Sequence, residues 1–392
     1  MLLKTNCLSC GSKQLMSFYE LSNVPVNSNL LLPSRAEAVS FPRGEVRLAF
    51  CEDCGFIQNV LFNENRIEYS PAYLETRAVS PHLAQFLEEQ AARLVKSYDL
   101  HNKDILEIGC GNGDFLARLC RLGPNRGVGI DPAYSPEARP AGQVEGLRFI
   151  SDFYSDKYLG LSADFIACRH TLEHIAPVHE FVDLVRRAVG ERRDTVVFFE
   201  VPDTARVLRE LAFWDIYYEH CSYFSLGSLA RLFRSCGFDV FDLQSGFDGQ
   251  YLLIDSVAAN GGDGPYWETE DDIAEMRGLV KYFRDNQPAK VKEWWQALRK
   301  ARSGGKIALW GSGSKAISFL TTLGTRDELE FVVDINPANQ GKFLPGSGHE
   351  IVAPEFLGEY QPDTVIAMNP AYQDEIRRHL DRLGVKAELT AV

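Results

Sequence analysis

The most constraining feature of the sequence is a glycine-rich turn that joins a short apolar run to an amphipathic segment. The turn runs from Glu107 to Asp114, between a strand expected at 105–108 and a helix expected at 114–122. A strand, a tight turn and a helix in this order predict an open α/β sheet with a ligand at its carboxyl edge. Three glycines permit the sharp turn and let a ligand come close to the backbone: Gly109, Gly111 and Gly113.

The alternation of strands and helices continues on both sides of this turn. It predicts four parts: a loop-rich N-terminal module at 1–80, an α/β domain at 81–262, a linker helix at 263–302 and a second α/β domain at 303–392. In the first α/β domain, further helices are expected at 80–98, 178–189 and 226–236, and strands at 128–130, 165–168, 195–201, 238–244 and 251–258. In the second, strands are expected at 307–309, 331–333 and 364–368, and a helix at 316–323.

The charge and hydropathy of the chain exclude two classes of partner. Its 392 residues carry 54 acidic and 41 basic side chains, for a net charge of −13. An acidic surface argues against nucleic acid, because affinity for phosphates depends on cationic contacts. The chain has no run of about 20 apolar residues that predicts a membrane span, and its first residues lack the apolar core of a signal peptide. A cytoplasmic protein with a small-molecule substrate is expected.

Four of the nine cysteines form two C-x-x-C pairs, Cys7 with Cys10 and Cys51 with Cys54. Two residues between ligands let one tight turn direct both sulfurs to the same metal ion, and four thiolates close the coordination sphere of a structural zinc. The alternatives are redox pairs or coincidence, but no thioredoxin-like context surrounds either pair. The remaining cysteines are scattered and are expected to be buried apolar side chains: Cys110, Cys120, Cys168, Cys221 and Cys236.

The charges around the glycine-rich turn indicate which ligand it binds. A nicotinamide fingerprint requires a small residue where this chain has Asp114, and a carboxylate there repels a pyrophosphate. Glu107 before the turn instead suits a cation, as in the sulfonium of S-adenosylmethionine. Asp131 ends the next strand, where it can accept the ribose hydroxyls. Asp152 and Phe153 are expected at the adenine, with a helix N-cap and core packing as their alternatives.

Two clusters downstream carry the expected chemistry. His170-Thr-Leu-Glu-His174 follows a strand at the ligand-binding edge, and a zinc site there lacks an apparent third ligand. The second cluster contains Tyr217, Glu219 and His220. A histidine base, a carboxylate that orients it and a tyrosine donor suit the removal of a proton next to a carbonyl. The alternative is a satisfied polar network between domains.

The C-terminal domain opens with a second glycine-rich turn. Gly311-Ser-Gly313-Ser-Lys315-Ala316 follows a strand, and Asp334 ends the next one. This spacing is that of a nicotinamide fingerprint. The alternative is a degenerate Rossmann domain that docks on the first α/β domain and closes its cleft.

Together these segments resemble the NDP-deoxysugar C-methyltransferase family. The matching stretches are the two C-x-x-C pairs, Leu21–Asn29, Ile216–Ser225, Trp310–Lys315, Val333–Pro337 and Gly341–Gly346. The resemblance implies a class I methyltransferase Rossmann-like domain flanked by a four-cysteine zinc module and a C-terminal Rossmann-like domain. It implies a 4-keto-6-deoxy sugar nucleotide as substrate and His220 as the base. Tyr217, Glu219 and His174 are implied in the active site. His170 is expected beside the cofactor because it follows a strand at the ligand-binding edge of the sheet.

The chain departs from the family at positions on the substrate side. Tyr73 is a loose counterpart of a family tyrosine, and Gln250 replaces part of a small turn. Tyr73, Tyr223, Gln250 and Lys315 are expected to bind substrate, Lys315 through a phosphate. Two further functions stay open: an O- or N-methyltransferase acting on a small metabolite, and a protein whose C-terminal domain binds a dinucleotide.

Overall fold

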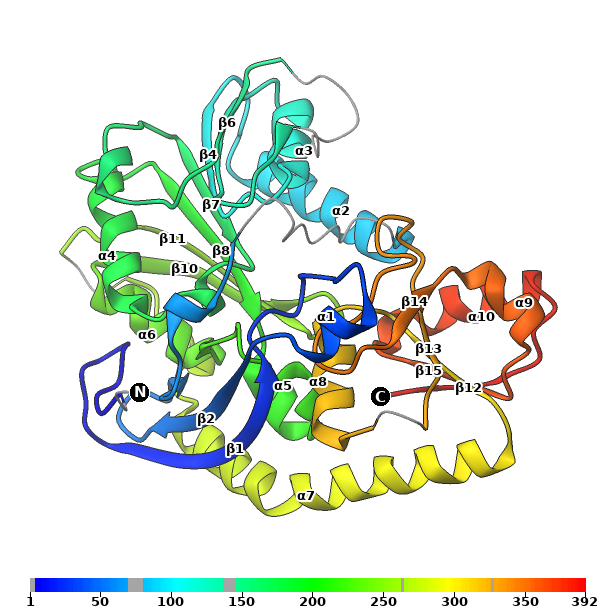
Figure 1. Ribbon diagram of the computed structural model, residues 1–392. Coiled ribbons are helices and arrows are strands. Elements are labelled where there is room, and N and C mark those ends of the chain that lie inside the picture. Colours follow the sequence, from blue (N-terminus) through cyan, green and yellow to red (C-terminus); the bar gives the residue numbers. More distant parts are fainter. Residues whose placement is uncertain (1–3, 70–79, 137–144, 262–263, 326–327) are drawn as a thin grey trace.

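The computed structural model describes residues 4–69, 80–136, 145–261, 264–325 and 328–392. The described strands form three β-sheets, and the middle and C-terminal sheets carry helices (Figure 1). Among the described residues, short 3-10 helices lie between the main elements: η1 (Glu64–Arg66), η3 (Asp156–Tyr158), η4 (Leu172–His174), η5 (Phe213–Asp215), η6 (Glu268–Glu270), η7 (Pro354–Phe356) and η8 (Pro370–Tyr372). None of the helices described is both long and apolar enough to cross a membrane.

The N-terminal sheet has four strands in the order β1-β2-β3-β9. Its members are β1 (Leu15–Pro25), β2 (Arg43–Cys51), β3 (Ile57–Asn59) and β9 (Ser222–Tyr223), and the short helix α1 (Arg35–Val39) joins the first two. The expectation of a loop-rich module is wrong, because β1 and β2 form a long antiparallel pair. Two irregularities in this pairing, at Ser17/Tyr19 and Leu21/Val24, break the period of two by which a strand is recognised.

The central sheet has seven strands in the order β10-β11-β8-β7-β4-β5-β6. The five strands from β8 to β6 are parallel. β11 is antiparallel to β8, and β10, which pairs antiparallel with β11, runs in the same direction as those five. The strands are β4 (Asp104–Ile108), β5 (Arg126–Ile130), β6 (Leu147–Ile150), β7 (Phe165–Arg169), β8 (Val196–Pro202), β10 (Phe238–Gly246) and β11 (Tyr251–Ala258). The helices of this domain are α2 (Pro81–Ser97), α3 (Asp114–Leu122), α4 (Val178–Val189), α5 (Thr204–Arg209) and α6 (Leu226–Ser235).

The strand order reverses between β4 and β7, and in open α/β sheets a ligand binds at such a point. The helices predicted at 114–122 and 178–189 have the expected bounds. The expected strands lie within a few residues of β4, β5, β7, β8, β10 and β11. The short edge strand β6 was not predicted as a definite element.

The C-terminal sheet has five parallel strands in the order β14-β13-β12-β15-β16. They are β12 (Ile307–Trp310), β13 (Phe331–Val333), β14 (Glu350–Val352), β15 (Thr364–Ala367) and β16 (Glu388–Ala391), with helices α8 (Ser314–Leu323), α9 (Leu357–Tyr360) and α10 (Gln373–Arg382). The two edge strands, β14 and β16, were not predicted. Both have three or four residues and little buried apolar surface, so their sequences carry a weak signal.

The expected linker helix is α7 (Ile273–Gly304), which runs along one side of the molecule from the central domain to the C-terminal domain (Figure 1). It also contributes to a hydrophobic core, because Phe283 is fully buried against Phe18 and Tyr19 of β1. The same core includes Phe213, which stacks on Phe319 of α8. The chain between α5 and β9 is therefore packed against both outer domains.

Candidate active site

A cavity of about 720 Å³ lies at the carboxyl edge of the central sheet, where the strand order reverses. The glycine-rich turn forms one wall. Gly109 and Gly111 both have positive φ, of 71° and 54°. A Cβ at Gly109 would collide with the side chain of Thr171, whereas a Cβ at Gly111 would meet no atom within 4 Å. A glycine is thus required at position 109 because the side chain of Thr171 packs against it. Gly111 instead leaves open space beside the backbone.

Two acidic side chains, Glu107 and Asp131, line this cavity. Glu107 is buried, its Oε2 accepts a hydrogen bond from the Leu116 N–H at 3.0 Å, and burial raises its pKa to about 8 against the opposing effect of Arg169. Asp131 accepts from the Gly111 N–H and the Ala133 N–H, both at 2.8 Å. Burial raises the pKa of Asp131 as well. A cation in the cavity would stabilise both carboxylates.

Asp152 and Phe153 are placed differently from one another. Asp152 accepts hydrogen bonds from Lys157 and from the Tyr158 hydroxyl, and these partners hold its pKa at about 2. It is not among the residues that line the cavity, and the N-cap of η3 is Ser155. Phe153 lines the cavity with 60% of its surface exposed, so the alternative of core packing is wrong for this ring.

His170 lies where two cavities meet. It follows β7 in a left-handed conformation, with φ of 49°, and its Nε2 lies 2.7 Å from Glu200 Oε1. Arg169 pairs with the same carboxylate at 2.6 Å, and together they hold the pKa of Glu200 at about 2 although burial opposes this. Three residues line both cavities: Leu83, His170 and Tyr251.

The second cavity measures about 1000 Å³ and is bordered by all three domains. The N-terminal domain contributes Ser28 and Asn29, and the central domain contributes Tyr217 and His220. The C-terminal domain contributes its glycine-rich turn and the carboxyl ends of three strands, including Trp310, Gly311, Ser312, Gly313, Ser314, Lys315, Asp334 and Met368. Such a cavity, at the junction of domains, is a typical place for a substrate.

Tyr217 and His220 form a pair in the wall of this second cavity. The Tyr217 hydroxyl lies 3.0 Å from His220 Nε2, and the two ring centroids are 4.1 Å apart. The imidazole of His174 is the next ring, 4.8 Å from that of His220, and it lines the first cavity. Tyr217, His220 and His174 therefore form a connected group that reaches from one cavity to the other.

Glu219 does not have the expected position beside the imidazole of His220. Its carboxylate accepts hydrogen bonds from Asn27 Nδ2 at 3.2 Å, from the Ser28 N–H at 2.8 Å and from the Ser28 hydroxyl. It thus fastens a segment of the N-terminal domain under the second cavity. The carboxylate that faces His220 is that of Glu173, which the sequence did not single out although it lies within the His170–His174 motif.

The expected substrate residues differ in their placement. Gln250 lines the second cavity and pairs through its amide with Asn369, at 3.2 and 3.1 Å. Tyr223 does not line the cavity; it is buried, and its hydroxyl donates to the Tyr217 carbonyl at 3.4 Å. Tyr73 lies outside the described residues.

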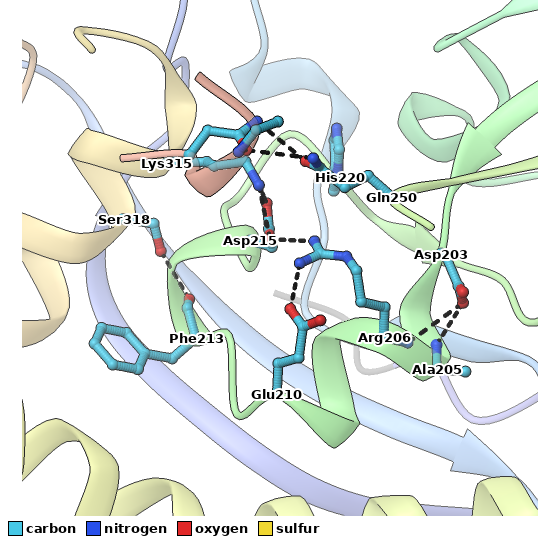
Figure 2. Close-up of polar contacts among 12 residues, drawn as sticks. Asp203, Ala205, Arg206, Glu210, Phe213, Asp215, His220, Gln250, Lys315 and Ser318 are labelled. Atoms are coloured by element: carbon cyan, nitrogen blue, oxygen red, sulfur yellow. Dashed lines mark hydrogen bonds and ion pairs between the residues drawn. The ribbon is translucent and has the colours of Figure 1, made fainter. Parts of the chain in front are cut away.

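Lys315 belongs to a partly buried charge cluster at the second cavity (Figure 2). Its Nζ lies 2.8 Å from Asp215 Oδ1, and Arg206 pairs with Asp215 at 2.6 Å and with Glu210 at 2.7 Å. Burial lowers the pKa of Lys315. Burial acts to raise the pKa of Asp215, but Lys315 and Arg206 hold it below its ordinary value. No sequence pattern identified Arg206, which α5 supplies.

The four cysteines of the N-terminal module come together away from both cavities. The Cys7–Cys54 and Cys10–Cys51 sulfurs are each 3.6 Å apart, and all four sulfurs lie within 4.8 Å of one another. Tetrahedral zinc with Zn–S bonds of roughly 2.3 Å separates its sulfurs by about 3.8 Å. Each pair lies in a turn closed by a glycine N–H, from Gly11 to the Cys7 carbonyl and from Gly55 to the Cys51 carbonyl. The donor set and its spacing fit zinc.

A family model described as a methyltransferase domain matches residues 77–243. This range contains the walls of the first cavity from Gly109 to Glu180. The reversal of strand order, the acidic cavity and this match agree with one another. They define the chain as an S-adenosylmethionine-dependent methyltransferase.

The C-terminal part of the chain indicates which kind of methyltransferase this is. A family model described as the C-methyltransferase C-terminal domain matches residues 267–387. The chain is also 26% identical over 402 aligned residues to the C-methyltransferase NovU of Streptomyces niveus, covering 94% of this chain and 90% of NovU. These two matches support a C-methyltransferase.

Solved structures share only a low overall likeness with the chain. The 1,6-didemethyltoxoflavin-N1-methyltransferase of Burkholderia thailandensis is 18% identical, with 44% of this chain and 79% of that one covered and a TM-score of 0.36. An O-methyltransferase family protein from the same organism is 16% identical, with 46% and 57% covered and a TM-score of 0.38. Scores this low add nothing to the assignment.

Proposed function

We propose that the chain methylates a carbon next to the ketone of a nucleoside-diphosphate-activated deoxysugar, through an enolate formed when His220 removes the adjacent proton. The observation that carries the proposal is the Tyr217–His220 pair in the wall of the second cavity, which meets the first cavity at His170. A base on the substrate side and a cofactor cavity on the other side are the arrangement that methyl transfer to carbon requires.

The proposed reaction moves one proton and one methyl group. His220 accepts the proton from the substrate carbon, and the electron pair of the C–H bond moves into the enolate. The Tyr217 hydroxyl donates a hydrogen bond to the enolate oxygen, which stabilises the developing charge. When bound in the first cavity, S-adenosylmethionine would supply the electrophilic methyl group for this carbon, with S-adenosylhomocysteine as the leaving product. The imidazolium of His220 then returns its proton to solvent.

The first cavity has the groups that S-adenosylmethionine requires. Asp131 lies at the end of β5, beside the glycine-rich turn, where it can accept the ribose hydroxyls. The exposed ring of Phe153 offers a stacking surface for adenine. Glu107 and Asp131 supply the negative charge for the cationic cofactor. Asp152, in contrast, is occupied by Lys157 and Tyr158, so a role at adenine would require that pair to open.

The second cavity has groups that suit a sugar nucleotide. Its volume exceeds that of the cofactor cavity, and helix α8 begins at its edge, after Gly313. The first N–H groups of a helix favour a phosphate, and the adjacent Lys315 adds a cation that Asp215 holds in place. The resemblance of Trp310–Lys315 and Val333–Pro337 to the sugar-nucleotide enzymes supports the same substrate class. We further propose a structural zinc on the four clustered cysteines.

The proposal is tested by incubating the purified protein with S-adenosylmethionine and a panel of nucleoside-diphosphate keto sugars. The expected product has gained one methylene unit in mass, with the methyl on carbon by NMR. A methyl on oxygen or nitrogen would contradict the enolate mechanism. Loss of deuterium from the labelled substrate carbon, without cofactor, measures the proton-removal step alone.

His220→Ala tests the proposed base. A missing general base costs a factor of about 10²–10⁴, and we expect methylation and deuterium loss to fall together while the affinity for S-adenosylmethionine stays the same. His101→Ala is the matched control, because His101 lies on the surface beside Asp99. Deuterium loss at the wild-type rate in His220→Ala would show that another group is the base.

A further inference from the structure

The side chain of Glu173 is a buried carboxylate surrounded by imidazoles. It lies in η4, directly after the strand β7, and is 1% exposed. Its Oε1 lies 3.5 Å from His170 Nδ1 and 4.0 Å from His220 Nε2, and a ring nitrogen of His174 is within 4.8 Å of the same group. Neither carboxylate oxygen has a hydrogen-bond partner among the described residues.

The backbone fixes Glu173 relative to His220. The N–H of Cys221, the residue after His220, donates to the Glu173 carbonyl at 3.0 Å, and the Cys221 thiol contacts the same oxygen at 3.6 Å. The Ser222 hydroxyl donates to the Ile175 carbonyl at 2.8 Å. Two segments almost 50 residues apart are thus held in one register. These hydrogen bonds between the two segments hold the Glu173 carboxylate close to the His220 imidazole.

We propose that Glu173 is the positioning residue for His220, holding the imidazole in place and stabilising its protonated form after proton removal. The inference rests on the proposed role of His220 as the base. An isolated buried carboxylate is unfavourable unless a positive charge forms near it. An imidazolium within about 4–6 Å of a carboxylate is favoured over neutral imidazole. Proton removal creates that imidazolium with its Nε2 4.0 Å from Glu173 Oε1, a distance at which the two opposite charges stabilise each other.

Among the residues that the structure describes, the other groups with a stated contact to His220 leave this role to Glu173. The Tyr217 hydroxyl lies at 3.0 Å, and the rings of His174 and Tyr223 are 4.8 and 6.3 Å away. These groups are not carboxylates. Glu219, the neighbour in sequence, accepts instead from Asn27 and Ser28.

The second histidine beside Glu173 has a carboxylate of its own. His170 contacts Glu200 at 2.7 Å, a shorter distance than its 3.5 Å to Glu173. Glu200 thus compensates a charge on His170, and Glu173 remains available to His220. Each imidazole therefore has its own carboxylate, Glu200 for His170 and Glu173 for His220.

The test compares Glu173→Gln with the wild type, using S-adenosylmethionine and a thymidine-diphosphate 4-keto-6-deoxyhexose as the probe. We expect kcat to fall about tenfold or more, and the acid limb of the kcat/KM profile to move to lower pH by roughly 1–3 units, because a neighbouring negative charge is lost. Deuterium loss from the substrate should fall in step with kcat. The affinity for S-adenosylmethionine should not change.

Two further variants separate positioning from a general loss of stability. Glu173→Asp keeps the negative charge but places it farther from His220, because the side chain is shorter. This variant should retain more activity than Glu173→Gln and keep the acid limb near its wild-type position. Should Glu173→Gln fail to fold, the Asp variant still decides the matter, because an unchanged kcat there would refute a distance-dependent role. Glu270→Gln is the matched control: Glu270 is equally buried, pairs with Arg234 and lies outside both cavities.

Three outcomes would overturn the inference. An unmoved acid limb and an unaltered rate of deuterium loss in Glu173→Gln would show that the carboxylate serves only packing. A second tightly bound metal ion per chain, lost in Glu173→Gln, would show that Glu173, His174 and His220 are metal ligands instead. Full deuterium loss in His220→Ala would refute the proposed base itself, a result that is distinguishable because it does not depend on Glu173.

Discussion

The burial of the Glu107 carboxyl group leads to a prediction about the stability of the protein and its affinity for the cofactor. This side chain lies beneath the glycine-rich turn, 2% exposed, with its Oε2 bonded to the Leu116 N–H. Burial raises its pKa from an ordinary 4.5 to about 8. Glu107→Gln keeps the size of the side chain and an oxygen that accepts from Leu116, but it removes the group that titrates. We expect this variant to be more stable than the wild type and to bind S-adenosylmethionine less tightly.

The magnitude follows from the two pKa values. Between pH 4.5 and 8 the folded protein holds a proton on Glu107 that the unfolded chain has released, so stability falls as pH rises through this interval. Each pKa unit corresponds to about 1.4 kcal/mol. The cost at pH 7 is then about 3 kcal/mol, and at pH 5 about 1 kcal/mol. Glu107→Gln should therefore gain up to about 3 kcal/mol at pH 7 and much less at pH 5.

Urea denaturation of both proteins without cofactor, at pH 5, 7 and 8.5, measures this difference. Calorimetry gives the second half of the prediction: the affinity of the wild type for S-adenosylmethionine should rise with pH up to about 8, because the cation favours ionised Glu107. The affinity of the variant should lack this dependence. Equal stability of the two proteins at all three pH values would refute the reasoning, since it would mean that burial does not penalise the charged form of Glu107.

Three further changes test other parts of the structure. Asp131→Ala should weaken S-adenosylmethionine binding by roughly 1.5–3 kcal/mol, because charge-assisted hydrogen bonds are lost; unchanged affinity in calorimetry would mean that the cofactor lies elsewhere. Cys51→Ser should remove the bound zinc and lower the melting temperature, and metal analysis that finds no zinc in the wild type would contradict the site. Gly109→Ala should destabilise the protein by more than about 1 kcal/mol, because its methyl group collides with Thr171; an unaltered melting temperature would show that the turn can rearrange.

The glycine-rich turn shows what could be predicted from local sequence. The strand before it, the helix after it and the carboxylate at Asp131 all follow from a pattern within about 30 residues. The structure brings Gly109, Gly111 and Asp131 to one cavity. The two C-x-x-C pairs could equally be predicted from the sequence, because each pair is a local turn. Their approach to one another follows from the metal that four thiolates suit.

The N-terminal sheet shows where local patterns fail. Its last strand, β9, comes from residues 222–223, and nothing in a two-residue segment predicts that it pairs with β3. The irregular pairing of β1 with β2 also hides the alternation of side chains. Edge strands of three or four residues, such as β14, have too few positions to establish a period.

The sequence by itself determined the class of chemistry, because residue types and short spacings specify a cofactor turn, four thiolates and a histidine beside a tyrosine. The tertiary structure alone decided which carboxylate faces that histidine. Glu219 is adjacent in sequence but accepts hydrogen bonds from Ser28, whereas Glu173 reaches His220 from another strand end. The physical reason is that an electrostatic partner is selected by distance in space. Chain packing over nearly 50 residues sets that distance, and no local pattern records it.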